Sequence, residues 1–516
     1  MPVERFSDFA LQLRGEDNVA VARKPIPAGT VLERGDWKVA LRKDIPFGHK
    51  FAIARIDRDD PVRKYGQTIG FAGGEIQPGD HVHVHNLVCK DFARDYAFGT
   101  DVRPVQYHPP DRMRTFPGYL RSDGRVGTRN YLAVISSVNC SASVSQYVAE
   151  RFRGDDFRRE FPNVDGVIAF THKGGCGVQL GEPHQILQRV LAGIARHPNI
   201  YGYVMIGLGC EINQAAQLVV DQRLNIPRPG QQQPTVMNIQ TEGGVRKTVE
   251  SAAAAVRKLL PAANACVRTP QPVSKLALAL NCGGSDGNSG ITANPALGVA
   301  SDELVRYGGT AVLAETPEIY GAEQLLTRRA VSAEVGQKLL ERIKWWEEHV
   351  RTHGATLDGN PSVGNKLGGL TTIYEKSLGA VAKGGQSPLA AVYKYAETID
   401  KPGFAFMDTP GYDPVSMTGL VSGGCNIGVF TTGRGSVYGC KPAPCIKVAT
   451  NTPMYTHMED DMDLNAGTIL EGETVETVGM RLFDLIVRVA GGEKTKSEAA
   501  GIGDAEFAPW MIGVTF

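Results

Sequence analysis

Two patterns of hydrophobic and polar positions divide the chain. Up to about residue 90, short apolar runs of strand character are separated by turns; from Tyr119 onward, apolar strands are followed by Gly-rich turns and amphipathic helices. Repeated strand, turn and helix units are typical of a mostly parallel sheet. The patterns predict an α/β protein, with a small N-terminal β domain followed by two Rossmann-like α/β domains.

The N-terminal region repeats one kind of turn between β-patterned runs. The turns are Ile26-Pro27-Ala28-Gly29, Ile45-Pro46-Phe47-Gly48 and Ile76-Gln77-Pro78-Gly79. Short strands bounded by Pro and Gly indicate a small β-rich domain, which we place at residues 1–90. Residues 91–115 lack periodicity and contain Pro109-Pro110, so they are predicted to be a linker.

The rest of the chain is predicted to hold two α/β domains, at residues 116–270 and 271–516, separated near the Ala- and Pro-containing stretch 253–274. One helix is expected over Ala333–His353, where apolar residues recur every three or four positions. The predicted strands are Tyr131–Val138, Val167–His172, Val204–Gly207, Thr235–Ile239, Leu276–Leu280, Thr310–Glu315, Phe404–Met407, Ile427–Phe430 and Ile446–Ala449.

Composition narrows the class of partner. The 55 Lys+Arg balance 55 Asp+Glu without a basic stripe, which argues against nucleic acid, and 42% apolar residues argue against disorder. Neither a targeting segment nor an apolar run of about 18 residues is visible. Nine cysteines without a Cys-x-x-Cys spacing do not resemble a secreted disulfide framework. We expect a cytoplasmic protein that does not bind membranes.

Polar, Gly-rich segments follow many of the predicted strands. Ligands of open α/β sheets bind beyond the carboxyl ends of the strands, so these segments predict one cleft. They are Ser137–Ser141, Thr171–Gly177, Gly207–Glu211, Asn281–Asn294, Glu315–Tyr320 and Thr431–Gly435.

Four of these segments carry a cysteine, namely Cys140, Cys176, Cys210 and Cys282. Thiolates from separate strand ends could ligate iron or an iron–sulfur cluster. Alternatively, each cysteine could be a small buried apolar residue, as free cysteines often are. The sequence leaves both interpretations open.

Histidines form a second candidate centre. In His81-Val82-His83-Val84-His85 the period of two would place the imidazoles on one strand face and both valines on the other. We expect metal or substrate contact from His83 and His85 rather than His81, although the run could also be a solvated strand face. His49 follows the turn at Gly48, and His172 lies in a Gly-rich loop.

Cations in Gly-flanked turns are candidate ligands for a carboxylate. They are Arg129, Lys366 and Arg434, of which the arginines offer bidentate contacts. The chain has no GxGxxG after its first strand, no Walker A loop and no GxSxG elbow. Nucleotide cofactors and serine hydrolysis therefore lack support.

The same segments resemble the altronate/galactarate dehydratase family, and the similarity runs from about Asp17 almost to the C-terminus. The end of the first region (GDHVHVHN) and SGGCNIGVF, with Cys425, resemble the altronate-type members. The matching segments are Arg121–Cys140, Thr171–Gly177, Gly207–Glu211, Cys282–Pro295, Asn360–Thr372, Phe430–Gly435 and Asn465–Thr468.

The resemblance implies an N-terminal β-clip (SAF-type) domain and a lyase that removes water from an aldonate or aldarate, most simply D-altronate. The product is a 2-keto-3-deoxy sugar acid, formed with Fe²⁺ or Mn²⁺ and no organic cofactor. Alternatives are galactarate dehydration, sulfite loss from sulfolactate, and a sugar-acid-binding protein without catalysis. A homo-oligomer is expected.

Roles follow from residue chemistry at these segments. We expect His172 to act as acid/base, with Lys366, Glu315 and Asp286 as further catalytic candidates. The expected metal ligands are His83, His85 and His49, with Cys140, Cys176, Cys210 and Cys282 as the alternative set. The expected substrate ligands are Arg434, Arg129, Thr432 and Asn288.

Overall fold

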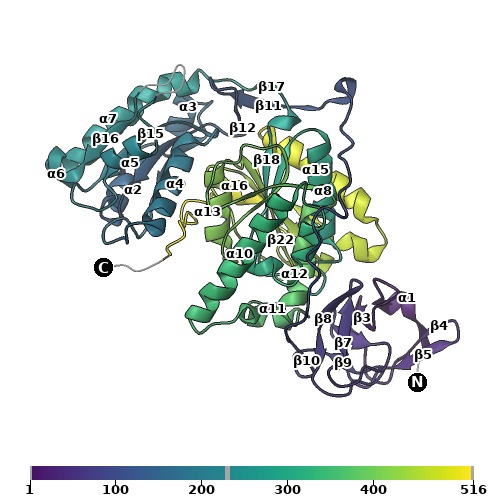
Figure 1. Cartoon of the computed structure of the whole chain (residues 1–516). Coiled ribbons are helices and arrows are strands. Elements are labelled where there is room, and N and C mark those ends of the chain that lie inside the picture. The colour runs from purple at the N-terminus through teal and green to yellow at the C-terminus, as the bar shows by residue number, and fades with distance from the viewer. Residues whose placement is uncertain (1–2, 227–232, 513–516) are drawn as a thin grey trace.

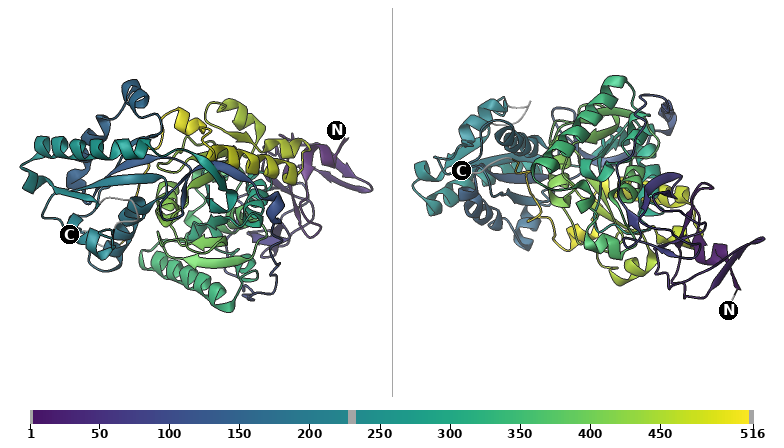
Figure 2. Two further views of the ribbon diagram at one scale, coloured as in Figure 1. Left: turned by 90° about the horizontal axis from the view of Figure 1, so that it is seen from above. Right: turned by 60° about the horizontal axis from the view of Figure 1, so that its bottom comes forward.

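A computed structural model describes residues 3–226 and 233–512. The N-terminal β region, the second α/β region and the large C-terminal α/β region lie in a row with the C-terminal region in the middle (Figures 1 and 2). The sheets have mostly parallel strands outside the N-terminal region, as predicted for an α/β protein.

The N-terminal region consists of three small sheets and one short helix, α1 (Phe6–Phe9). The sheet orders are β1-β4-β5, β2-β3-β6-β9 and β10-β8-β7. Their strands are β1 (Val3–Arg5), β2 (Ala10–Leu11), β3 (Val19–Ala22), β4 (Val31–Arg34), β5 (Trp37–Ala40), β6 (Lys50–Ala52), β7 (Pro61–Lys64), β8 (Gln67–Ala72), β9 (His81–Val82) and β10 (Leu87–Val88).

The repeated turns of this region have a common backbone. Gly29, Gly48 and Gly79 have φ of 80°, 76° and 86°, a left-handed conformation that glycine adopts without a Cβ clash. A fourth copy carries Asp59, with φ of 68°, in the glycine position. Because Asp replaces Gly there, the sequence pattern did not reveal this copy.

The second region has a parallel sheet of order β14-β13-β15-β16 with helices on both faces. Its strands are β13 (Tyr131–Ser136), β14 (Gly166–Phe170), β15 (Ile200–Gly207) and β16 (Thr235–Asn238). Its helices are α2 (Ala142–Glu150), α3 (Asp155–Glu160), α4 (Glu182–Arg196), α5 (Ala215–Asp221), α6 (Ile239–Glu242) and α7 (Val245–Asn264). Helix α7 includes much of the stretch that was expected to separate two domains.

The C-terminal region is built on a seven-stranded sheet of order β20-β21-β19-β18-β22-β23-β24, in which every neighbouring pair is parallel. Its strands are β18 (Ala277–Cys282), β19 (Thr310–Leu313), β20 (Leu389–Tyr393), β21 (Gly403–Met407), β22 (Ile427–Thr432), β23 (Cys445–Ala449) and β24 (Leu464–Asn465). All nine predicted strands are confirmed, whereas β20 and β24 were not predicted.

The helices of the C-terminal region cover both faces of this sheet. The predicted helix at Ala333–His353 is confirmed as α10. The helices are α8 (Ala293–Arg306), α9 (Gln324–Thr327), α10 (Ala333–Thr352), α11 (Val363–Leu367), α12 (Ile373–Val381), α13 (Asp413–Gly423), α14 (Thr452–His457), α15 (Val475–Ala490) and α16 (Lys496–Ala499).

Two connections join the three regions. Residues 91–109 contain no helix or strand and run along the C-terminal region, where Tyr96 donates a hydrogen bond of 2.7 Å to Glu323. A small antiparallel sheet of β11 (Thr115–Leu120), β12 (Val126–Gly127) and β17 (Thr269–Pro272) joins the second region to the C-terminal one. Among the described residues, no helix is both long and apolar enough to cross a membrane.

Candidate metal centre and active site

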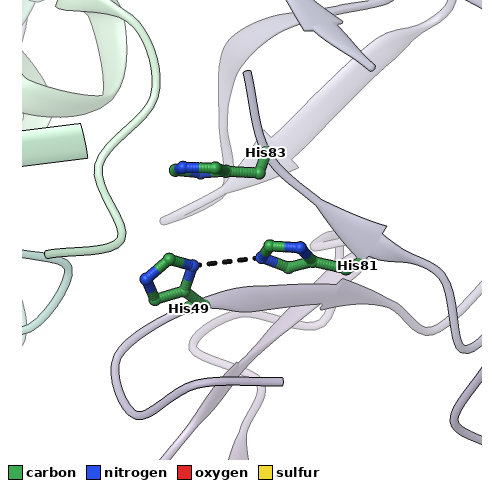
Figure 3. A group of neighbouring side chains, drawn as sticks. All are labelled: His49, His81 and His83. Carbon is green, nitrogen blue, oxygen red and sulfur yellow. Dashed lines mark hydrogen bonds between the residues drawn. The ribbon is translucent and has the colours of Figure 1, made fainter. Parts of the chain in front are cut away.

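Three histidines meet where the N-terminal region faces the C-terminal region. Strands β6 and β9 are antiparallel, with Phe51 opposite His81 and Lys50 opposite Val82, so His49 and His83 flank this pairing. Nδ1 of His49 lies 3.0 Å from Nε2 of His81 (Figure 3). One ring nitrogen of each of His49, His81 and His83 lies within 4.8 Å of the others. Their geometry is that of a possible three-nitrogen metal site.

The expected alternation of His81 to His85 along one strand is wrong. Strand β9 ends at Val82, and a turn follows in which Asn86 accepts from the His83 amide and donates to the His81 carbonyl. Val84 is consequently 48% exposed instead of buried. His81 therefore joins the cluster, while His85 is exposed, with its ring centroid 5.6 Å from that of His81.

The cluster favours neutral imidazoles. Burial, followed by the neighbouring histidines, lowers the pKa of His81 to about 3, and burial with the nearby Lys50 lowers the pKa of His83 to about 4. Neutral imidazole is the form that binds transition metals, iron among them. Within the described residues, the buried Nδ1 of His83 has no hydrogen-bond partner. These observations fit a metal ion held by the three rings.

Glycines bring the polar loops of the C-terminal region against this cluster. A Cβ on Gly369 would lie 3.3 Å from Cδ2 of His49, and one on Gly368 would lie 3.1 Å from Cδ of Arg434. Nε2 of His49 lies 3.2 Å from the carbonyl oxygen of Leu367. The histidine cluster and Arg434 therefore flank the same short segment after α11.

Asp286 organises the loops behind this segment. Its buried carboxylate accepts hydrogen bonds of 3.0 Å from Ser289 and Thr450 and of 3.2 Å from Asn451, while burial raises its pKa. Asn288 is also buried, and no partner of its Oδ1 is found in the described part of the chain. Thr432 is buried and its hydroxyl accepts from the Gly435 amide at 3.1 Å.

Arg434 and Lys366 are the cations placed to meet an anionic ligand. Arg434 is exposed and Lys366 is half-buried. The salt bridges formed by the described residues include neither of them. Both charges thus remain available for a carboxylate.

A buried ionic cluster lies at the ends of β18 and β19. Nζ of Lys383 is 3.0 Å from both Sγ of Cys282 and Oε2 of Glu315, and Nζ of Lys376 is 2.7 Å from Oε1 of Glu318. Donor atoms of Cys282, Glu315 and Glu318 lie within 4.8 Å of one another. Two ammonium groups already neutralise this cluster, so the histidine centre is the better cation site.

Two carboxyl groups in this cluster have pKa values near neutrality. Burial and the carboxylate of Glu318 raise the pKa of Glu315 to about 8 and that of Asp413 to about 7. Glu315 also has a left-handed backbone with φ of 71°, a conformation that costs a non-glycine residue about 1–3 kcal/mol. Perturbed carboxyl groups and local strain are typical of functional sites. Glu315 was expected from the sequence, whereas Asp413 was not.

Lys50, Lys64 and Glu375 connect the N-terminal and C-terminal regions. Glu375 accepts a hydrogen bond of 2.9 Å from each lysine, and all three side chains are buried. Burial alone would raise the pKa of Glu375, but the two ammonium groups outweigh it and bring the pKa to about 2. Because Lys50 directly follows His49, this triad fixes the strand that carries the histidine.

Several expected site residues lie elsewhere. His172 is buried in the second region, where Nε2 lies 3.0 Å from the Ser136 carbonyl and Nδ1 accepts from the Gly174 amide. Both of its ring nitrogens are therefore engaged. Cys140, Cys176 and Cys210 lie in the same region, whereas Cys282 lies in the buried ionic cluster. The four cysteines do not form a single ligand set.

Arg129 joins the second and C-terminal regions. Its Nε and Nη2 donate to the two carboxylate oxygens of Glu498 at 2.7 and 2.8 Å, and its remaining N–H groups donate to the carbonyls of Thr128, Val489 and Glu493. All five guanidinium donors are thus satisfied within the protein. Arg129 has no donor left for a substrate in this structure.

A β region whose histidines meet the loops of a parallel α/β sheet defines a modular enzyme with a site between its parts. Family models match all three: "Altronate/galactarate dehydratase SAF domain" at residues 8–90, "D-galactarate dehydratase/Altronate hydrolase, second domain" at 118–264 and "D-galactarate/Altronate dehydratase, C-terminal" at 273–515. The chain belongs to the altronate/galactarate dehydratase family, a family of hydro-lyases.

Similarity to individual members extends over nearly the whole chain. Altronate dehydratases of Bacillus subtilis (strain 168) and Escherichia coli (strain K12) are each 35% identical, with 98% of this chain and 99% of the relative covered. The galactarate dehydratase (L-threo-forming) of Escherichia coli (strain K12) is 38% identical over 94% of this chain and 93% of the relative.

Proposed function

We propose that this protein removes water from a sugar acid, with D-altronate as the first candidate, and yields a 2-keto-3-deoxy acid. The observation that carries the proposal is the cluster of His49, His81 and His83 beside the loop of Lys366 and the exposed Arg434. Full-length similarity to two altronate dehydratases supports the choice of substrate.

His49, His81 and His83 would hold Fe²⁺ or Mn²⁺, with iron better suited to three imidazoles. Such a metal supplies Lewis-acid stabilisation for the negative charge that develops when the C2 proton is removed. His85, exposed beside His81, is positioned to contact solvent or substrate at the rim.

Arg434 and Lys366 would bind the substrate carboxylate, Arg434 through a bidentate contact. Asn288 has an unpartnered Oδ1 among the described residues and lies beside Gly48, next to His49 in the chain, so it is suited to accept a hydrogen bond from a substrate hydroxyl. Thr432 and Asp286 hold the loop that carries Arg434.

Asp413 and Glu315 are the proposed proton-transfer groups. A base with a pKa near the working pH is about half ionised and still able to accept a proton, which Asp413 satisfies with a pKa of about 7. Glu315, with a pKa of about 8, is mostly protonated at neutral pH and could donate to the departing 3-hydroxyl. The C2–H and C3–O bonds break, water leaves, and the resulting enol tautomerises to the ketone.

Galactarate is the second candidate substrate, because the galactarate dehydratase relative has the higher identity of 38% over a slightly shorter alignment. Both substrates are polyhydroxy acids with a carboxylate beside the C2 hydroxyl, so the proposed contacts serve either. An assay with altronate, galactarate and sulfolactate as separate substrates distinguishes the three reactions by the keto acid or sulfite formed.

The proposal predicts that His83→Asn loses at least a hundredfold in kcat with altronate and Fe²⁺. The affinity of the histidine cluster of this variant for Fe²⁺, measured anaerobically by competition with a chelator, should also fall at least tenfold. His353→Asn, which changes an exposed histidine in the turn after α10, is the matched control and should retain both properties. Wild-type turnover by His83→Asn, or the absence of keto acid from every acid tested with the wild type, would contradict the proposal.

A further inference from the structure

Three exposed cysteines lie at one edge of the second region's sheet, away from the histidine cluster. Cys140 follows β13, Cys176 follows β14 and Cys210 follows β15, and β13 lies between the other two strands. Because all three strands are parallel, their carboxyl ends meet at the same edge. Ser136 pairs with Ile206 in register, so Cys140 and Cys210 each lie four positions past a paired residue.

Hydrogen bonds lock the three cysteine loops together. The Asn139 amide donates 2.9 Å to the Gly174 carbonyl, which joins the loops of Cys140 and Cys176. The Asn213 amide donates 3.1 Å to the Gly175 carbonyl, which joins the loops of Cys210 and Cys176. The Ser137 hydroxyl donates a hydrogen bond of 2.8 Å to Glu211, which joins the loops of Cys140 and Cys210. Each pair of the three loops is thus joined by a hydrogen bond, which restricts the positions of the thiols.

The exposure of these cysteines is unusual for residues with only a packing role. Free cysteine is among the most buried residue types, and Cys282, Cys425 and Cys445 in the C-terminal region follow that rule. Cys140, Cys176 and Cys210 are exposed instead, and all nine cysteines are free thiols. Cys210 Sγ accepts a 3.4 Å hydrogen bond from the side-chain amide of Gln240.

Buried polar atoms close to these loops also lack partners. Within the described residues, Oδ1 of Asn213 and Oδ1 of Asn238 are buried without a hydrogen bond. Asn213 lies three residues after Cys210, and Asn238 ends the strand beside β15. An unpaired buried amide oxygen destabilises the fold, and a bound group or its water could supply the missing hydrogen bond.

The three thiols do not lie close enough together in this structure to surround a single metal ion. Among the described residues, the three sulfurs do not form a group of ligand atoms that all lie within 4.8 Å of one another. A single tetrahedral ion with bonds of about 2.3 Å would need sulfurs about 3.8 Å apart. A cluster of several irons bridged by sulfide spans a wider set of thiolates.

We propose that Cys140, Cys176 and Cys210 bind a [4Fe–4S] cluster through three thiolates, leaving one iron without a cysteine ligand. Each thiol loses its proton on ligation. Cys282 does not complete the set, because it is buried in the C-terminal region with Nζ of Lys383 at 3.0 Å. The proposal is independent of the histidine centre and of the substrate.

A cavity of about 680 Å³ borders Cys176, one of the three cysteines. Cys176 and its loop neighbours line one side, and residues 504–512 line the other. The iron that lacks a cysteine ligand would be the one able to take water or an oxygen of a small acid.

The test is reconstitution of the anaerobically purified full chain with Fe²⁺ and sulfide, followed by iron and acid-labile sulfide analysis and visible absorption. Wild type should bind about four iron and four sulfide per chain, after any iron at the histidine site is removed with chelator. Each of Cys140→Ser, Cys176→Ser and Cys210→Ser should lose at least 80% of the sulfide and of the sulfide-to-iron absorption band.

Two matched variants separate this centre from other metal sites. Cys266→Ser, at a half-buried cysteine just after α7, should keep full sulfide content, and so should His83→Asn. Wild type without acid-labile sulfide would overturn the proposal, as would iron uptake without sulfide or zinc in place of iron. Unchanged sulfide in the three cysteine variants would overturn it as well.

Discussion

At the scale of single residues, glycines determine how closely the polar loops approach. A Cβ on Gly433 would overlap the carboxyl group of Asp286, and a Cβ on Gly368 would lie 3.0 Å from Cβ of Asp286. The abundance of glycine, 60 of 516 residues, is therefore partly explained by a site in which backbone contacts side chain directly. Asp286 keeps its hydrogen bonds only while Gly433 has no side chain.

A single substitution tests the contact between Gly433 and Asp286. Gly433→Ala should displace the Asp286 carboxylate and the neighbouring Arg434, because overpacking of a close contact typically costs about 1–3 kcal/mol. We expect a lower free energy of unfolding by that amount and at least a tenfold loss in kcat/KM. Gly364→Ala on α11 is the control, since the nearest atom to its new Cβ would be Oγ of Ser362 at 3.8 Å. Equal activity of the two variants would contradict the prediction.

The residues of the proposed metal site were only partly predictable from the sequence. The pattern indicated a histidine centre with His49 and His83, but the turn made by Asn86 decides that His81 and not His85 completes the group of three. A period of two holds only while the chain stays extended. Asp413 was missed because its altered pKa depends on burial beside Glu318, which is distant in sequence.

At the scale of elements, strand β6 and helix α12 fix the histidine centre to the C-terminal region. Glu375 on α12 holds Lys50 of β6 and Lys64 of β7 at 2.9 Å each. Thr371 adds a 2.6 Å hydrogen bond to the same carboxylate. The negative charge of Glu375 therefore compensates the positive charges of two buried ammonium groups.

Glu375→Gln should destabilise the protein by about 3–5 kcal/mol, because it leaves buried ammonium groups without a counter-charge. Chemical unfolding at pH 7 measures this loss. Glu341→Gln, on the exposed face of α10, should change the free energy of unfolding by less than about 0.5 kcal/mol.

The pH dependence of the same contact has a defined sign. The pKa of Glu375 falls from its ordinary 4.5 to about 2 in the folded protein. Its contribution is therefore fully present above about pH 4.5 and is lost as the pH falls toward 2. The difference in stability between wild type and Glu375→Gln should shrink in that window, and a difference that grows on acidification would contradict the assignment.

The elements that were predicted share long apolar runs, and those that were missed do not. Most of the nine predicted strands are buried in parallel sheets, which require continuous apolar segments, whereas β16 is a half-buried edge strand. Strand β24 has only two residues, and β20 alternates buried and half-buried positions. Pairing with neighbouring strands, rather than local sequence, decides that these segments are extended.

At the scale of the whole molecule, buried contacts join the second region to the C-terminal one. Arg129 pairs with both carboxylate oxygens of Glu498, and Asn199 donates 2.9 Å to the Pro442 carbonyl. Helices α4 and α13 approach so closely that a Cβ on Gly193 would overlap the Ser422 carbonyl. The second region is thus held in a fixed position, and an iron–sulfur centre there would keep a constant relation to the histidine site.

Loss of the Arg129–Glu498 pair tests this coupling. Glu498→Gln keeps a side chain able to serve in the capping box of α16, but it removes the carboxylate that pairs with the 2%-exposed Arg129. We expect a loss of about 3 kcal/mol and a separate, earlier unfolding transition of the second region in calorimetry. Glu493→Gln breaks the exposed pair with Arg488 in the same segment and should cost under about 1 kcal/mol, with a single transition. Identical unfolding curves for the two variants would show that the buried pair does not couple the regions.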